Sequence, residues 1–216
     1  MMRIGSRWAA LAVLSVALAC SNKDSTSPGG AGDDGDYRGI FSATDGITAF
    51  GGALVITIQS AAASGTLTPS GQAGVSLSGT FNTSTKAVSL SGGGHTLGGT
   101  INSSGELKGT YSGAGGDGTF ATQRGTSSEV QGFCGTFTGD ATGTWNLSKR
   151  ANSLVGAYAS DDGDSGALTG TLSGSAISIT VSGGGTATGT LTSATQMTGT
   201  WAVGGGAGSW TGHSPC

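Results

Sequence analysis

Few side chains in this chain could perform chemistry, and none of them form a recognisable catalytic set. The two histidines, His95 and His213, occupy different places in the sequence pattern, so we expect surface or turn positions for both. A catalytic serine needs a histidine base held by an acid, and no sequence motif joins a serine to either histidine. Glu106 and Glu129 are the only glutamates, which leaves little material for a glycosidase carboxylate pair. We therefore expect a protein that is not an enzyme and has no cofactor.

An acidic cluster offers the one candidate metal site. Asp161, Asp162 and Asp164 stand within a stretch of four residues, between two expected strands. Calcium prefers such groups of oxygen ligands. The alternative is an acidic hairpin loop with no metal, since an Asp-Asp-Gly sequence is also typical of a turn. We favour the loop.

The tryptophans are the candidate ligand-binding residues. Trp145, Trp201 and Trp210 each follow a glycine by two residues, on the side of the strand expected to face the core. They could form a stacking platform for a glycan or a small apolar ligand. They could equally fill the core of a barrel that is otherwise poor in bulky side chains, and we favour this second interpretation. The aromatic residues of the first half that invite the same interpretation are Phe81, Tyr111 and Phe120.

A repeated glycine pattern indicates the elements that position these residues. The triplet of Gly, Thr and a large apolar residue occurs ten times, and 44 of the 216 residues are glycine, far above the usual share of roughly 7%. The glycine spacings of the first half recur in the second half, almost unchanged. We interpret this as two tandem copies of one unit of about 85 residues. The glycines that define the series are 52, 65, 79, 99, 109 and 118, and then 143, 156, 170, 189, 199 and 208.

Alternation within each unit predicts strands. Ile177, Ile179 and Val181 alternate with polar residues, as in a half-buried strand, and turn sequences separate such runs about every ten residues. We expect an all-β fold of about eight strands per unit, arranged as antiparallel up-and-down meander barrels, with a β-sandwich as the alternative. In each triplet the glycine should leave room for a large inward neighbour, while threonine faces solvent.

The N-terminal sequence predicts that the protein is exported from the cytoplasm. Arg3 and Arg7 precede a short apolar run that ends in small residues, as in a secretory signal. The run is too short to span a bilayer, which takes about 20 residues. The sequence Ala17-Leu18-Ala19-Cys20 resembles the lipobox of bacterial lipoproteins. That resemblance implies cleavage before Cys20 and its lipidation, whereas the alternative is an ordinary signal peptide cut nearby.

The resemblance also implies a location. Ser21 follows the cysteine in place of the aspartate that tends to retain such proteins at the inner membrane, so the outer membrane is expected, with the protein facing the periplasm or the surface. The predicted organisation is a signal peptide over 1–19, a lipidated and flexible tether over 20–36, and barrel units over 37–125 and 132–216.

Two cysteines support closure of the second unit. Cys134 opens its first expected strand, and Cys216 ends the chain just after its last. The first and last strands of an even-numbered barrel are antiparallel neighbours, so the two residues should lie close together. Disulfides form in the oxidising compartments to which exported proteins go, so the expected export favours a disulfide between these two cysteines. Its stabilisation would be about 4–5 kcal/mol in the chain-entropy model, and the first unit, which has no such pair, should be the weaker one.

The short strands and Gly-Thr-aromatic repeats of each unit resemble the calycin-like barrels, such as avidin-type proteins and lipocalins. The similarity includes the Gly-x-aromatic sequences Gly39-Ile40-Phe41 and Gly135-Thr136-Phe137. It implies the barrel architecture and brings no set of ligand residues.

The expected function is that of a non-enzymatic, lipid-anchored envelope protein that serves as a structural or surface module. The alternative is a binding protein that holds a small apolar ligand or a glycan in a barrel mouth. The expected partner is the membrane, through the anchor, and the sequence identifies no protein partner. The chain is acidic, with a net charge of −3, and only 10% of its residues are charged, which excludes a nucleic-acid binder. A single sixteen-stranded pore is also excluded, because serine and threonine would face the lipid.

Overall fold

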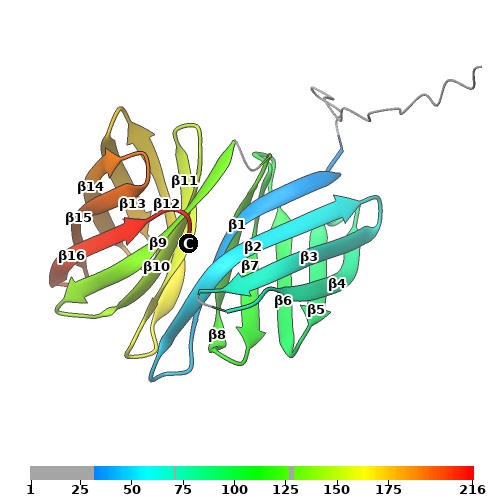
Figure 1. The fold of residues 1–216 in the computed structure, drawn as a ribbon, viewed down its shortest axis with the longest axis horizontal. Helices are drawn as coiled ribbons and strands as arrows, with labels where there is room; N and C mark the ends of the chain where they lie inside the picture. The colour runs from blue at the N-terminus through cyan, green and yellow to red at the C-terminus, as the bar shows by residue number, and fades with distance from the viewer. Residues whose placement is uncertain (1–31, 71, 127–128) are drawn as a thin grey trace, which may run out of the picture. The chain divides into compact units, whose positions relative to one another are not determined.

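The protein consists of two closed, antiparallel β-barrels in tandem (Figure 1). The computed structural model describes residues 32–70, 72–126 and 129–216. Strands are the regular elements throughout this part of the chain, and no helix long and apolar enough to cross a membrane occurs in it. The predicted signal peptide, the predicted lipidation site Cys20 and most of the predicted tether lie outside the described residues. The predicted fold class is confirmed, and closure excludes the sandwich alternative.

Barrel 1 is an eight-stranded meander in which each strand pairs with the next and β1 closes onto β8. Its strands are β1 (Gly35–Thr44), β2 (Ala49–Gln59), β3 (Ala62–Pro69), β4 (Val75–Asn82), β5 (Ala87–Gly92), β6 (His95–Ile101), β7 (Glu106–Gly113) and β8 (Gly116–Arg124).

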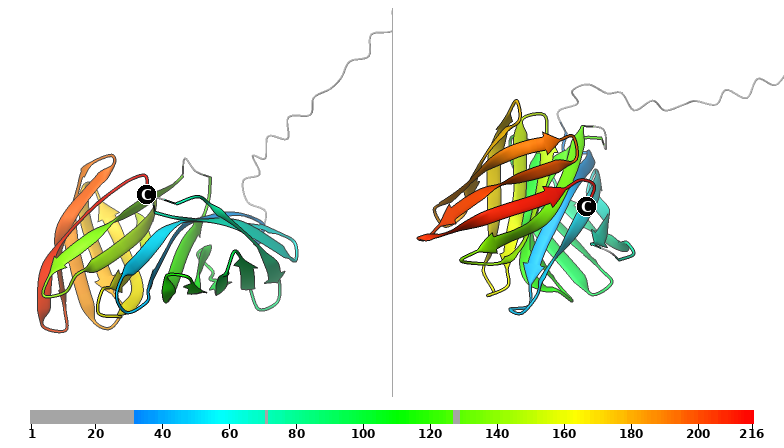
Figure 2. Two further views of the ribbon diagram at one scale, coloured as in Figure 1. Left: turned by 60° about the horizontal axis from the view of Figure 1, so that its bottom comes forward. Right: turned by 60° about the vertical axis from the view of Figure 1, so that its left-hand side comes forward.

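Barrel 2 repeats this topology, and β9 closes onto β16 (Figure 2). Its strands are β9 (Val130–Gly139), β10 (Gly143–Arg150), β11 (Ser153–Ser160), β12 (Ser165–Ser173), β13 (Ala176–Val181), β14 (Gly185–Ser193), β15 (Gln196–Val203) and β16 (Gly206–His213).

The hydrogen-bond registers show that the two barrels are copies of one design. Phe41 of β1 stands opposite Gly52 of β2, and Phe137 of β9 stands opposite Gly143 of β10. The same register recurs between the last two strands of each barrel, where the paired residues are Tyr111 and Gly118 in barrel 1, and Trp201 and Gly208 in barrel 2. Equivalent positions can therefore be compared directly.

The repeated glycines make space for large rings inside the barrels. A Cβ at Gly199 would lie 2.5 Å from Cζ2 of Trp210, and one at Gly189 would lie 2.4 Å from the same atom. Carbon atoms in favourable contact lie about 3.5–4.0 Å apart, so the indole can cover these two strands only because neither glycine carries a side chain. This confirms the role predicted for glycine beside a large inward residue.

Solvent-facing threonine and serine cover most strands, and one part of the surface departs from that expectation. The outward faces of β1, β8, β10 and β11 are buried, as the fully buried Ile40 and Ser42 on β1 show. Asn146 on β10 donates a 2.8 Å hydrogen bond to the carbonyl of Phe41, and Gln123 on β8 donates a 3.0 Å bond to the carbonyl of Ser148. These outward residues contact the other barrel instead of water.

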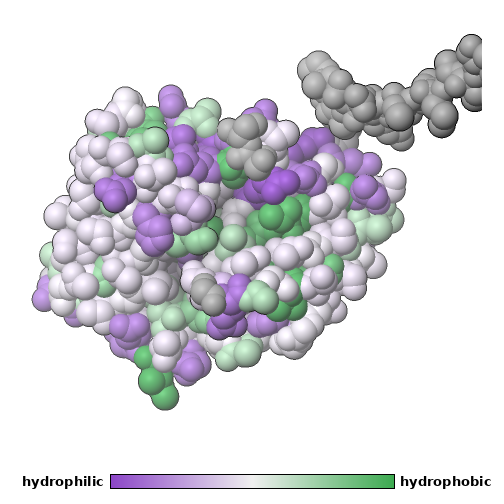
Figure 3. All heavy atoms as spheres, viewed as in Figure 1, coloured by the Kyte–Doolittle hydropathy of each residue, from purple (hydrophilic) through white to green (hydrophobic). Residues whose placement is uncertain are grey.

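Elsewhere the surface carries little apolar material. Figure 3 shows a face of mostly intermediate hydropathy with scattered hydrophilic residues and two apolar areas, one near β2 and one at the tip of the β1–β2 hairpin. Within the described ranges, Ile47 is the large apolar side chain with high exposure, at 82%.

Candidate functional site

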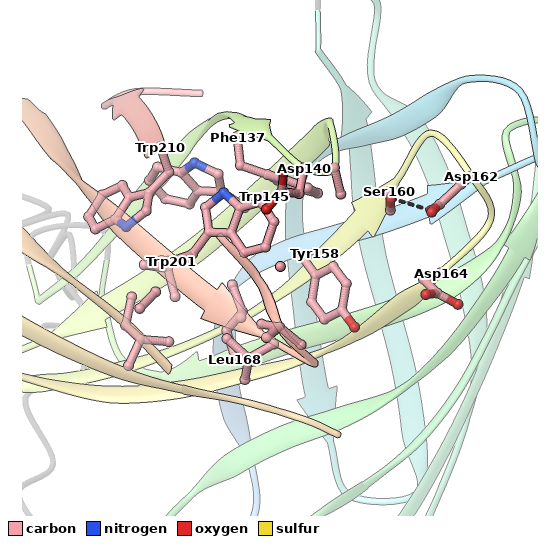
Figure 4. Close-up of a pocket in the computed structure, with 17 residues that line it drawn as sticks. Phe137, Asp140, Trp145, Tyr158, Ser160, Asp162, Asp164, Leu168, Trp201 and Trp210 are labelled. Carbon is pink, nitrogen blue, oxygen red and sulfur yellow. Dashed lines mark hydrogen bonds between the residues drawn. The ribbon is translucent and has the colours of Figure 1, made fainter. Parts of the chain in front are cut away.

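Barrel 2 holds a cavity of about 210 Å³ at one end (Figure 4). Residues of the β9–β10, β11–β12 and β15–β16 hairpins line its mouth, and inward side chains of the strands line its depth. An engineered apolar cavity of about 150 Å³ is large enough to bind benzene. The barrel 2 cavity can therefore hold one aromatic ring with a short substituent.

Aromatic rings make up much of the wall. Trp145 and Trp210 meet edge to face, with centroids 5.3 Å apart and an interplanar angle of 82°. Phe137 makes similar contacts with Trp201 at 5.9 Å and with Tyr158 at 6.4 Å. Such edge-to-face pairs are favourable and hold the rings in place around the cavity. The candidate residues Trp145, Trp201 and Trp210 thus fill the barrel core and also line the space that is left.

The indole N–H groups are already satisfied by the strands. Trp145 donates to the carbonyl of Thr136 at 3.3 Å, and Trp201 donates to that of Thr138 at 3.2 Å. Trp210 donates to its strand neighbour through a 3.1 Å bond to Thr200. A ligand in the cavity therefore meets ring carbon from these three residues and no free indole donor.

Three carboxylates, which we call the aspartate rim, line the cavity near its mouth: Asp140, Asp162 and Asp164. Asp140 accepts a 2.9 Å hydrogen bond from the backbone N–H of Ala207. The hydroxyl of Ser160 donates to Asp162, and this bond is the main reason that the pKa of Asp162 lies below its usual value.

Tyr158 stands between the tryptophans and two of these aspartates (Figure 4). Burial raises the pKa of its hydroxyl, and the charges of Asp164 and Asp162 raise it further. The two carboxylates therefore act electrostatically on the interior of the cavity.

The acidic cluster predicted from the sequence is divided by the structure. Asp162 and Asp164 belong to the rim, whereas Asp161 accepts a 2.6 Å hydrogen bond from the hydroxyl of Thr142 and does not line the cavity. Within the ranges that the structure describes, no three His, Cys, Asp or Glu side chains are grouped so as to hold a metal ion. The arrangement gives the calcium candidate no support.

The equivalent end of barrel 1 is filled by three side chains, which we call the barrel 1 plug: Phe50, His95 and Tyr111. Tyr111 packs on Phe41 at 4.8 Å between centroids, and Phe50 packs on Phe41 at 5.6 Å. Nδ1 of His95 lies 2.7 Å from the hydroxyl of Tyr111, at hydrogen-bonding distance. Burial raises the pKa of that tyrosine to about 12.

His95 is therefore a correction to the sequence interpretation. We expected a surface or turn position, and the side chain is buried with 6% exposure because it pairs with Tyr111 inside the barrel. The expectation is correct for His213, which is exposed on β16.

Three replacements open the space in barrel 2. Counting back two residues from the equivalent glycines Gly52 and Gly143 pairs Phe50 with Ala141. Phe50 lies on β2 opposite Ala43, whereas Ala141 lies in the β9–β10 hairpin. At the start of the sixth strand of each barrel, His95 and Leu97 of barrel 1 correspond to Gly185 and Ala187 of barrel 2. Ala141 and Ala187 both line the cavity.

The two cysteines of barrel 2 come together as their positions predicted. Cys134 is buried on β9 and Cys216 is exposed beyond β16, and both are free thiols in the structure. A hydrogen bond between the two side chains lowers the pKa of Cys134 and raises that of Cys216. The disulfide between Cys134 and Cys216 stays a prediction. The hydrogen bond shows that the two thiol groups are neighbours.

Sequence reasoning missed Phe137, Tyr158 and Asp140 as lining residues, and it singled out Asp162 and Asp164 only as candidate metal ligands. Aligning the two glycine series would have paired Phe50 with Ala141, which is the signal that this end is filled differently in the two barrels. No significant match was found when the chain was compared with protein-family models, with curated proteins and with solved structures.

Proposed function

We propose that this protein is a lipid-anchored binding protein of the bacterial cell envelope, in which barrel 2 holds a small apolar ligand. The observation that carries the proposal is the contrast between the two copies. The same design is filled by Phe50 and His95 in barrel 1, and it holds a cavity of about 210 Å³ lined by Trp145, Trp201 and Trp210 in barrel 2. A gap of this size costs stability unless something occupies it.

The wall chemistry favours an apolar ligand over a glycan. The three indole N–H groups are bonded to strand carbonyls, as described above. A sugar would bring several hydroxyls, and a polar group buried without a partner costs free energy. An aromatic or short aliphatic ligand brings none.

The proposed location rests on the lipobox resemblance at Cys20 and on Ser21 after it. Multiple acyl chains on that cysteine would hold the protein at the outer membrane, since one chain alone gives only reversible attachment. We propose no catalytic step, in keeping with the chemistry expected from the sequence.

Ligand binding can be tested by tryptophan fluorescence. Benzyl alcohol titrated into the full chain should give a saturable change in emission, because three of the four tryptophans line the cavity. In Ala141→Phe, a ring should occupy the cavity as Phe50 occupies barrel 1, so the response should disappear while the far-UV circular dichroism is retained. A wild-type protein without a saturable response would overturn the proposal, as would an unchanged response in folded Ala141→Phe.

The anchor can be tested by acyl labelling in a Gram-negative host. We expect palmitate incorporation and outer-membrane fractionation for the wild type, and loss of both in Cys20→Ser. Label that survives in Cys20→Ser would contradict the assigned site.

A further inference from the structure

We propose that the ligand of the barrel 2 cavity is a small amphiphilic cation: an apolar body that rests on the tryptophans and an ammonium group that faces the aspartate rim. This inference rests on the proposed function and names its ligand class. It is carried by the placement of charge around the cavity, which neither the fold nor the apolar wall requires.

The acidic and basic side chains of barrel 2 lie at opposite ends of the barrel. Its four aspartates all lie in the hairpins at the cavity end, three of them in the rim and the fourth at Asp161. Its Lys and Arg residues, Lys149 and Arg150, lie at the far end of β10. Seven residue steps at about 3.3 Å each place Arg150 roughly 23 Å from the start of that strand. This distance exceeds the Debye length of about 8 Å at physiological salt, so these bases do not neutralise the rim.

Within the described ranges, no Lys or Arg side chain forms an ion pair with a rim aspartate. The ion pairs found there join Arg38 with Asp36, Lys86 with Asp33 and Lys108 with Glu106, all in barrel 1 or the segment before it. The rim therefore presents negative charge that protein side chains leave uncompensated.

Hydrogen bonds join the two hairpins that carry the rim. Thr142, in the β9–β10 hairpin, donates through its hydroxyl to Asp161, and its carbonyl accepts a 2.9 Å hydrogen bond from the backbone N–H of Asp161. These bonds tie together the hairpins that carry Asp140 on one side and Asp162 and Asp164 on the other. The backbone that carries the three rim aspartates is therefore held together around the cavity mouth.

The aromatic wall suits the same charge. The faces of Trp and Tyr rings attract cations that approach within about 6 Å of the ring centre, and Tyr158 lies between the tryptophans and Asp164 (Figure 4). An anionic ligand would meet repulsion from the rim. A metal ion would leave the apolar wall bare, whereas an ammonium on an apolar body satisfies both parts of the cavity.

The test compares three probes of nearly equal size in the full chain by isothermal titration calorimetry at pH 7: benzylammonium, benzyl alcohol and benzoate. We expect benzylammonium to bind at least about tenfold more tightly than benzyl alcohol, and benzoate to bind most weakly. Asp164→Asn and Asp162→Asn should each weaken benzylammonium several-fold and leave benzyl alcohol unchanged. The matched control is Asp117→Asn, which removes an exposed carboxylate from barrel 1 and should change nothing.

The possible failures are distinguishable. If none of the three probes binds, the proposed function is wrong and this inference falls with it. If benzyl alcohol binds as tightly as benzylammonium, the cavity is a binding site and the cationic assignment is wrong. Salt gives a check that does not depend on how a variant folds: raising ionic strength should weaken benzylammonium and spare benzyl alcohol, and equal salt sensitivity would overturn the assignment.

Discussion

Two adjacent glycines in β6 should respond oppositely to the same substitution. A Cβ at Gly98 would face outward and would find no heavy atom closer than Oγ1 of Thr110, at 4.0 Å. A Cβ at Gly99 would face inward and would lie 2.7 Å from Cζ of Phe120 and 2.4 Å from the carbonyl oxygen of Lys108. One position is open, and the other is covered by a ring and by backbone.

The difference in free energy follows from these distances. Gly98→Ala should stabilise the protein by about 0.5–1 kcal/mol, because alanine has less freedom to lose on folding. Gly99→Ala forces a backbone or ring shift, and such overpacking costs about 1–3 kcal/mol. The two variants should therefore differ by roughly 1.5–4 kcal/mol, although they are neighbours with the same change in chemistry.

Urea unfolding followed by far-UV circular dichroism measures this difference. With a slope of about 2 kcal/mol per molar urea, the midpoints of the two variants should lie roughly 1–2 M apart, with Gly98→Ala at or above the wild type. Equal midpoints, or a Gly99→Ala midpoint that matches the wild type, would refute the argument that inward-facing glycines such as Gly99 make room for aromatic rings.

Four further outcomes are expected. Phe50→Ala combined with His95→Gly, which gives barrel 1 the residue types that barrel 2 has at these two positions, should open a second site, so that calorimetry finds two benzyl alcohol molecules per chain in place of one; an unchanged stoichiometry would contradict the plug assignment. Asn146→Ala removes buried hydrogen bonds between the barrels and should cost about 2–3 kcal/mol of stability. Tryptophan emission reports on barrel 2 and circular dichroism on both barrels, so the two probes should no longer give the same unfolding transition. Reductant should lower the melting temperature of oxidised barrel 2 through the Cys134–Cys216 bridge and leave barrel 1 unaffected; a melt insensitive to reductant would count against the bridge. Binding of benzyltrimethylammonium should persist at pH 5 and weaken below about pH 4, because a hydrogen bond keeps the pKa of Asp162 low and protonation removes the attracting charge; a loss between pH 7 and pH 5 would contradict this.

The barrel architecture could be predicted because its determinants are local. Glycine spacing fixes where inward rings fit, and alternation such as that of Ile177 and Ile179 fixes which face is buried. The positions of Cys134 and Cys216 supported closure of the second unit only, and alternation by itself left a β-sandwich open, which the closed strand order excludes.

The cavity could not be predicted in the same way, because it depends on small side chains on different strands and hairpins that leave a common space unfilled. Ala141 is unremarkable in sequence and matters only because its equivalent in barrel 1 is Phe50. His95 was misplaced for a similar reason: at the start of a strand it resembles a turn residue, and its partner Tyr111 lies on the next strand. The buried Asn146 looks like any outward polar residue until the second barrel covers it.

A crystal structure of the full chain with 4-bromobenzylammonium tests the central claim most directly, since bromine can be located by anomalous scattering. The account predicts one bromine per chain, inside barrel 2 among Trp145, Trp201 and Trp210, with the ammonium toward Asp162 and Asp164. A bromine inside barrel 1, or an empty barrel 2 at saturating probe, would contradict it.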